Sequence, residues 1–158
     1  MYNTMSKLPS QRIKDLGLIL PPPPPPAGLY KPVLVIDGFL YVSGQGPMKT
    51  DGTYITGKVG DTMSLGEAKL AAEQVGLTML SIIKAHFGEI DRIKRLVKTL
   101  GMVNSTPEFD QHPLVINGFS ELMSDIFGME NGVGVRSAVG MTLPGQVAVE
   151  IEAMFQLH

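Results

Sequence analysis

The residues with the clearest chemical potential lie near the C-terminus, where one arginine and two glutamates occupy strand-like segments. Arg136 lies in the run 134–140, and Glu150 and Glu152 lie in the alternating run 147–155. A guanidinium presents a planar fork of N–H donors that can hold a carboxylate. A partly desolvated carboxylate can accept a proton from water. Together these residues predict a site that fixes a small acid and activates water beside it.

Alternation of apolar residues predicts how the chain presents these charges. In the run 147–155, one face carries five apolar residues, which we expect to face the core: Val147, Val149, Ile151, Ala153 and Phe155. If 143–146 is the turn of a two-stranded ribbon, Arg136 opposes Glu152 and Ala138 opposes Glu150, all on the non-core face. That face would form a shallow pocket. Alternatively, Arg136 and Glu152 form a structural cross-strand ion pair.

Composition indicates a single domain and excludes several classes of site. A chain of 158 residues with 44% hydrophobic residues can form one compact core. The formal net charge of −2 gives no overall field that would attract nucleic acid or an anionic membrane. Because there is no cysteine, disulfides, thiolate zinc sites and cysteine nucleophiles are excluded. Without a long apolar run or a signal-like N-terminus, we expect a cytoplasmic protein with no membrane partner.

We expect residues 1–26 to form an N-terminal arm and residues 27–158 to form the domain. A short helix in the arm would be capped by Ser10 and end at Gly17. The six prolines at 21–26 require extended polyproline II. We favour a strap that pins the arm to the body. The alternative is a docking site for a proline-recognising domain.

Residues 27–158 predict an α+β fold with the order ββαβαββ. Strands are predicted, from apolar and β-branched content between turn residues, at 33–37, 39–43, 92–104 and in the two halves of the ribbon. A long helix should begin at a capping box made by Ser64 and Glu67 and end at Gly88. Pro113 should open a second helix that ends at Gly128. Both helices should cover one face of the sheet.

Three motifs in this order resemble the YjgF/YER057c/UK114 family, also called the Rid family of reactive-intermediate deaminases. They are Ser43-Gly44-Gln45, Val115-Ile116-Asn117, and Arg136-Ser137-Ala138-Val139 followed by Leu143-Pro144 and Val149-Glu150-Ile151-Glu152-Ala153. The similarity runs from about Ala27 to Phe155 and is strongest to the branch labelled L-PSP endoribonuclease. The resemblance implies a chorismate-mutase-like α+β domain with helices on one face of a mixed sheet. It also implies a homotrimer with sites in clefts between subunits.

The resemblance further implies a role for each candidate residue. Arg136 would hold a substrate carboxylate, and Glu150 would position or activate water. Tyr30, Ser43 and Asn117 would line the pocket. The implied reaction hydrolyses reactive enamine or imine intermediates, such as 2-aminoacrylate, to 2-keto acids and ammonia without a metal or organic cofactor. On the residues alone, Ser43 could instead satisfy a turn, and Asn117 could instead cap a helix.

Two other functions stay open on the sequence. The cleft could sense a small carboxylate without turnover, because an arginine clamp serves binding and catalysis equally. An RNA-cleaving translation inhibitor would need a basic surface, for which the candidates are Arg92, Lys94, Arg95 and Lys98. That group lacks interleaved aromatic residues, so a solvated strand face is favoured and a nucleic-acid partner is not expected. The three histidines have no metal-ligand spacing, and we predict no metal site.

Overall fold

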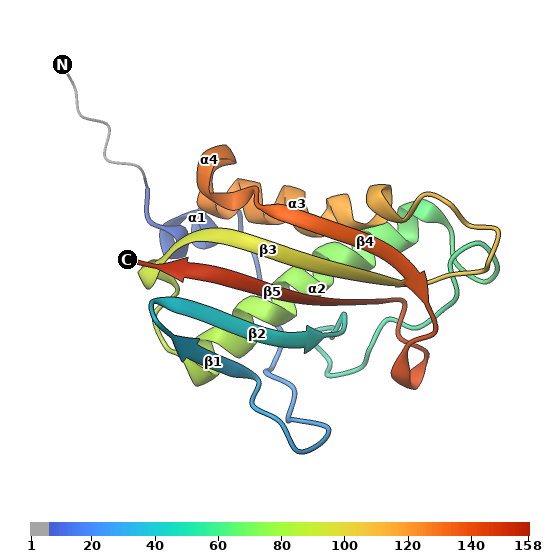
Figure 1. The fold of residues 1–158 in the computed structure, drawn as a ribbon, viewed down its shortest axis with the longest axis horizontal. Coiled ribbons are helices and arrows are strands. Elements are labelled where there is room, and N and C mark those ends of the chain that lie inside the picture. The colour runs from blue at the N-terminus through green and yellow to red at the C-terminus, as the bar shows by residue number, and fades with distance from the viewer. Residues whose placement is uncertain (1–6) are drawn as a thin grey trace.

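The computed structural model describes residues 7–158 and contains a five-stranded sheet with its two long helices packed on one face (Figure 1). In chain order the elements are α1 (Pro9–Asp15), β1 (Val33–Ile36), β2 (Phe39–Gln45), α2 (Leu65–His86), η1 (Ile90–Arg92), β3 (Ile93–Asn104), α3 (His112–Phe127), α4 (Met129–Gly132), β4 (Val135–Met141), η2 (Pro144–Gln146) and β5 (Val149–Leu157). The predicted α+β class and ββαβαββ order are confirmed, with α1 and α4 added. No helix in the described residues is both long and apolar enough to cross a membrane.

Local sequence signals position the first hairpin and the long helix. Asp37 and Gly38 have φ values of 49° and 79°, the left-handed pair that a two-residue turn between β1 and β2 requires. The Ser64 side chain accepts a hydrogen bond from the N–H of Glu67, while the Glu67 carboxylate accepts one from the N–H of Ser64. The predicted hairpin and capping box are therefore confirmed.

The order of the strands overturns the predicted C-terminal ribbon. The sheet order is β1-β2-β5-β3-β4, so β3 lies between β4 and β5. Strand β4 pairs in parallel with β3, because α3 forms the crossover connection between them. Strand β5 pairs antiparallel with β2 on one side and β3 on the other. The prediction that Arg136 opposes Glu152 in a hairpin is wrong.

The core lies between the sheet and the helices. The side chains of β4 lie on the opposite faces of the sheet from those predicted. In β5 the inward residues are Val149, Ile151, Ala153 and Phe155, as alternation predicts. In β4, Ala138 aligns with Gly101 of β3 and packs against the core. Arg136 and Ala138 therefore face α3, whereas Val135, Val139 and Met141 lie on the uncovered face. A small residue fits at 138 because α3 packs closely over this edge, where a Cβ at Gly101 would overlap Ile116.

The N-terminal arm packs against the body at two places. Ser10 is not the expected cap; it lies within α1, and its N–H and Oγ donate to the Asp91 carboxylate at 2.8 and 2.6 Å. In the proline run, Pro21 and Pro24 are buried and the two prolines between them are exposed. This three-residue spacing matches one turn of polyproline II. The Ser81 hydroxyl of α2 donates to the Pro21 carbonyl at 2.6 Å, which favours the strap interpretation.

Candidate functional site

The side chain of Arg136 is held by neutral groups of α3. Its Nη1 donates to Ser120 Oγ at 3.0 Å, and its Nη2 donates to Asn117 Oδ1 at 2.8 Å and to the Pro113 carbonyl at 3.1 Å. Among residues 7–158 no carboxylate forms an ion pair with Arg136. Because a guanidinium has five N–H groups, about two are left for another acceptor. The guanidinium is therefore oriented while its charge is unbalanced within the protomer.

These contacts decide two alternatives that the sequence left open. Asn117 lies inside α3, whose N-cap is Gln111, so Asn117 does not cap the helix. Arg136 and Glu152 leave the sheet from opposite faces, with β3 between their strands. A structural ion pair between these two residues of one chain is therefore excluded.

Glu150 lies on the uncovered face of β5, in a cleft of about 580 Å³ that also includes Tyr30 and Ser43. Three of the five predicted site residues thus come together in one cleft. Burial raises the pKa of the Glu150 carboxyl above its ordinary value, and repulsion from Glu152 raises it further. A carboxyl with a raised pKa is better suited to exchange a proton near neutral pH.

Gly44 provides the space in which the Glu150 carboxylate lies. A Cβ at position 44 would overlap Glu150 Oε1 and would lie 3.0 Å from its Cδ. The register of β2 against β5 shifts between Val42 and Gln45, which places Gly44 at an irregularity in the strand. The Glu150 carboxylate therefore depends on the absence of a side chain at this point.

Ser43 and Tyr30 make local contacts that fix the wall of the same cleft. Ser43 Oγ donates to the Pro32 carbonyl at 3.2 Å, and Gln45 Nε2 donates to Ser43 Oγ at 3.3 Å. The hydroxyl of Tyr30 accepts a hydrogen bond from the N–H of Ala27 at 3.2 Å. The Ser43 hydroxyl thus binds the Pro32 carbonyl on the neighbouring segment, not its own turn, and it still borders the cleft.

Arg136 and Glu150 of one protomer are too far apart to contact one small molecule. Arg136 aligns with Thr99 of β3, and Glu150 aligns with Met102. Three residues along the strands and two strand spacings across them separate the Cα atoms by roughly 14 Å. The two side chains also leave from opposite faces of the sheet. A small acid that touches both would need them from different protomers.

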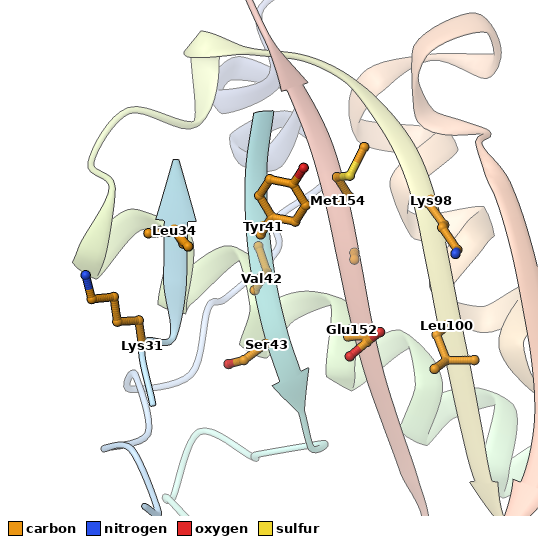
Figure 2. Close-up of a pocket in the computed structure, with 10 residues that line it drawn as sticks. Lys31, Leu34, Tyr41, Val42, Ser43, Lys98, Leu100, Glu152 and Met154 are labelled. Atoms are coloured by element: carbon orange, nitrogen blue, oxygen red, sulfur yellow. The ribbon is translucent and has the colours of Figure 1, made fainter. Parts of the chain in front are cut away.

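The uncovered face of the sheet carries a second hollow, shown in Figure 2. Its side chains come from four strands, with Leu34 on β1, Tyr41 and Ser43 on β2, Glu152 and Met154 on β5, and Leu100 on β3. Ser43 borders both this hollow and the cleft of Glu150. Large apolar side chains on this face are exposed, among them Leu34 at 41%, Tyr41 at 41%, Val139 at 39% and Met141 at 39%. Such a patch is typical of an interaction surface.

Two of the four candidate basic residues, Arg92 and Arg95, make structural contacts. The guanidinium of Arg92 lies 4.7 Å from the centre of the Phe87 ring. Arg95 donates to Asn131 Oδ1 at 3.1 Å and lies 3.8 Å from a Glu130 oxygen. Arg92 therefore packs beside the C-cap of α2 and Arg95 beside α4, whereas Lys98 borders the second hollow on the uncovered face. Within residues 7–158, no group of three or more histidine, aspartate or glutamate side chains could hold a metal ion.

The sequence reasoning missed three residues of the site. Ser120 follows Asn117 by three positions, so helical spacing could have identified it as a second ligand of Arg136. Gly44 is part of a motif that was recognised, but its contact with Glu150 depends on the sheet order. Tyr54, which lines the cleft of Glu150, lies in a connecting segment and gives no local signal.

Comparisons with known proteins identify the family. The model of a family described as "YjgF/chorismate_mutase-like, putative endoribonuclease" matches residues 10–146, a range that includes the proline run. Protein TCP17 of Trypanosoma cruzi is 37% identical over 159 residues, covering 98% of this chain and 99% of that protein. The crystal structure of Atu1372 from Agrobacterium tumefaciens, a protein of unknown function, is 39% identical with a TM-score of 0.84 and covers 96% of this chain and 94% of its own. A structure from Shewanella oneidensis MR-1 described as a putative endoribonuclease is 27% identical with a TM-score of 0.90, covering 96% and 100%. The chain belongs to the YjgF/chorismate mutase-like family.

Proposed function

We propose that this protein is a homotrimeric hydrolase that converts reactive 2-imino acids, such as the imine tautomer of 2-aminoacrylate, into 2-keto acids and ammonia. The observation that carries the proposal is the placement of an unbalanced Arg136 and a desolvated Glu150 on opposite faces of one sheet. Each cleft would join Arg136 and Asn117 of one protomer to Tyr30, Ser43 and Glu150 of its neighbour.

Arg136 would bind the substrate carboxylate. Three hydrogen bonds to neutral acceptors already orient the guanidinium, so little side-chain freedom is lost when an anion binds. Because Asn117 and Ser120 carry no charge, the full positive charge is left for the substrate. Fixing the carboxylate holds the imine carbon at a defined distance from the neighbouring protomer's cleft.

Glu150 would carry the proton transfers. As a water molecule attacks the imine carbon, the Glu150 carboxylate accepts one of its protons and passes it to the imine nitrogen, so a neutral tetrahedral carbinolamine forms. The Glu150 carboxylate then accepts the remaining hydroxyl proton as the C=O bond forms and passes it to the amino nitrogen as the C–N bond breaks, so ammonia leaves. One water is consumed, and one keto acid and one ammonia are produced. The raised pKa of Glu150 suits a group that both accepts and donates a proton in this cycle.

The exposed apolar patch on the sheet supports the proposed assembly. Leu34, Tyr41 and Val139 lie on a face that no helix of the protomer covers. Closed cyclic oligomers bury such a face by repeating one contact between neighbours. The same contact would bring a positive group of one protomer toward a negative group of the next. We expect three chains of 17.0 kDa, about 51 kDa in total, by sedimentation or light scattering.

The direct test measures release of ammonia and keto acid from an imino acid generated in the assay. Wild-type protein should accelerate release over the uncatalysed rate, and Arg136→Ala should abolish the acceleration. Arg92→Ala is the matched control, because Arg92 packs on Phe87 outside the cleft and its loss should leave the rate unchanged. If wild type binds keto acids but accelerates nothing, the protein is a carboxylate-binding module. If it instead binds RNA with a steep salt dependence, the nuclease alternative gains support.

A complementation experiment tests whether the cleft lies between protomers. Arg136→Ala and Glu150→Ala should each keep only a small residual activity alone. In a mixed trimer, one cleft joins Arg136 of a Glu150→Ala protomer to Glu150 of an Arg136→Ala protomer, and that cleft is intact. Random equal mixing gives mixed trimers about three quarters of the time, so coexpression should restore about one quarter of wild-type activity. Restoration near zero would contradict a shared cleft.

A further inference from the structure

The proline strap at 21–26 forms one wall of the cleft that contains Glu150, and this suggests a role in substrate choice. We propose, resting on the function above, that this cleft selects 2-imino acids with a large apolar side chain, of the size of leucine or phenylalanine. The strap would contact the substrate side chain while Glu150 acts at the imine carbon. The strap is thus assigned a specificity role in addition to its structural one.

Much of the lining of the cleft is apolar. Its walls include Pro24, Pro25 and Pro26 from the strap, with Ile82 from α2 and Val147 from the segment before β5. Ser43 and Gln45 are already engaged, since Gln45 Nε2 donates to Ser43 Oγ and to the Ser43 carbonyl, and Ser43 Oγ donates to the Pro32 carbonyl. A volume of about 580 Å³ is far more than a substrate with a methyl side chain would fill. The unfilled part therefore matches an apolar side chain.

Two tyrosines complete the apolar wall. Tyr30 follows the strap, and Tyr54 packs with its ring 3.1 Å from the place where a Cβ of Gly46 would lie. Burial raises the pKa of the Tyr54 phenol, and the nearby Tyr30 raises it further, so the Tyr54 phenol stays neutral at physiological pH. Neutral aromatic rings beside prolines favour an aliphatic or aromatic group over a charged one.

The strap is anchored at both ends, so its wall is preformed. Upstream, Pro21 accepts the hydrogen bond from Ser81, and Pro24 is buried. Downstream, Tyr30 accepts from Ala27, and Pro32 accepts from Ser43. Proline has a locked φ and no N–H, so the wall needs little ordering on binding and offers no donor to a polar side chain. A preformed wall of this kind discriminates by size and polarity.

The positions of the two hollows indicate which way the side chain of a bound substrate would point. Ser43 borders both the cleft and the hollow on the uncovered sheet face, the side from which a neighbouring protomer would bring Arg136, and Glu150 lies in the same cleft as Ser43. A substrate held there by its carboxylate has its imine carbon beside Glu150. The substituent on that carbon then extends away from the interface, toward the strap.

The experiment compares kcat/KM for imino acids derived from alanine, leucine and phenylalanine. A pocket that buries the larger group should favour the leucine and phenylalanine imines by at least ~10-fold over the alanine imine in wild type. Val147→Phe fills the cleft and should reduce the leucine-to-alanine ratio at least ~10-fold. Val133→Phe adds the same ring at an exposed position outside the cleft and should leave the ratio unchanged. Equal kcat/KM for all three imines would overturn the proposal while leaving imine hydrolysis intact.

A binding measurement separates failure of this proposal from failure of the proposed reaction. Calorimetry with the stable keto acids pyruvate, 4-methyl-2-oxopentanoate and phenylpyruvate reports side-chain preference without turnover. Tighter binding of the two larger acids, weakened by Val147→Phe, supports selection by the strap even if no imine is hydrolysed. Equal affinity for all three keto acids in a protein that hydrolyses no imine overturns both proposals.

Discussion

Replacing Gly44 with alanine should disable Glu150 while leaving the fold intact. The φ of Gly44 is not in the left-handed region, so its backbone accepts an alanine. The added Cβ would overlap Glu150 Oε1 and would lie 3.0 Å from Cδ and 3.2 Å from Cγ. Ordinary contacts between such atoms are about 3.5–4 Å, so the carboxyl must move by roughly 1 Å or more. Rotation of the flexible Glu150 side chain can absorb this shift.

The size of the expected effect follows from that displacement. A group misplaced by about 1 Å can lose on the order of 100-fold in rate, so kcat of Gly44→Ala should fall by about that factor. The free energy of unfolding should change by less than about 1 kcal/mol, because alanine restricts the unfolded chain and offsets the cost of moving Glu150. The variant should therefore be folded and nearly inactive.

A double-mutant cycle identifies the cause of the loss. Imine hydrolysis is measured for Gly44→Ala, Glu150→Ala and the double variant, together with denaturant unfolding of each. If Gly44 acts only by leaving room for Glu150, adding Gly44→Ala to the Glu150→Ala protein lowers the rate no further. Full activity of Gly44→Ala would refute the reasoning. So would a further loss in the double variant.

Three further predictions concern packing, pH and charge. Gly118→Ala would place its Cβ against the Lys69 carbonyl where α3 crosses α2, and should lower the free energy of unfolding by roughly 3 kcal/mol in denaturant titrations. Gly66→Ala, which meets nothing within 4 Å, should raise it by roughly 0.5–1 kcal/mol, and similar effects of the two changes would contradict the packing argument. Because the pKa of Glu150 is raised, the acidic limb of kcat/KM should lie above the ordinary glutamate range, and Glu150→Gln should remove it. The folded chain binds this proton more tightly than the unfolded chain, so the free energy of unfolding should fall as pH rises from the ordinary glutamate pKa through the raised one, and Glu150→Gln should flatten that slope. Asn117→Asp keeps the shape that orients Arg136 but neutralises its charge, so calorimetry should show weaker keto-acid binding than in Asn117→Ala.

Sequence patterns predicted the elements well because their signals are local. The capping box at Ser64, the left-handed turn at Gly38 and the glycine after α3 each act within a few residues. Alternation in β5 also identified the correct core face, because helices cover one side of that central strand and not the other. These predictions needed no knowledge of distant contacts.

The same alternation gave the wrong face for β4. Val135, Val139 and Met141 form an apolar face, but alternation does not say which side of the sheet the helices cover. Here α3 packs so closely that the covered side takes Ala138, and the larger apolar residues lie on the uncovered side. An apolar strand face that meets a partner chain has the same sequence pattern as one that meets the protein's own core.

The pairing of β4 with β3 could not be predicted from local sequence signals either. Consecutive antiparallel strands joined by a short turn usually pair with each other. In this fold, β4 and β5 do run antiparallel, but the connection at 142–148 carries the chain past β3, so β5 pairs on its far side. The predicted turn at 143–146 contains η2, but it does not close the predicted two-stranded ribbon, because β4 and β5 do not pair. Whether the connection at 142–148 joins two paired strands or two strands separated by β3 depends on contacts with β2 and β3.

That single difference in strand order changes what the charged residues can do. In the predicted hairpin, Glu152 would neutralise Arg136 across the strand pair, and Glu150 would lie two residues away on the same face. Separated by β3 and on opposite faces, Arg136 keeps its charge among neutral acceptors, and Glu150 stays partly desolvated beside another carboxylate. Two uncompensated charges of opposite sign on one small domain favour association in which the positive group of one copy approaches the negative group of the next. A small anionic substrate placed between them completes the charge balance, so binding and assembly would favour the same geometry.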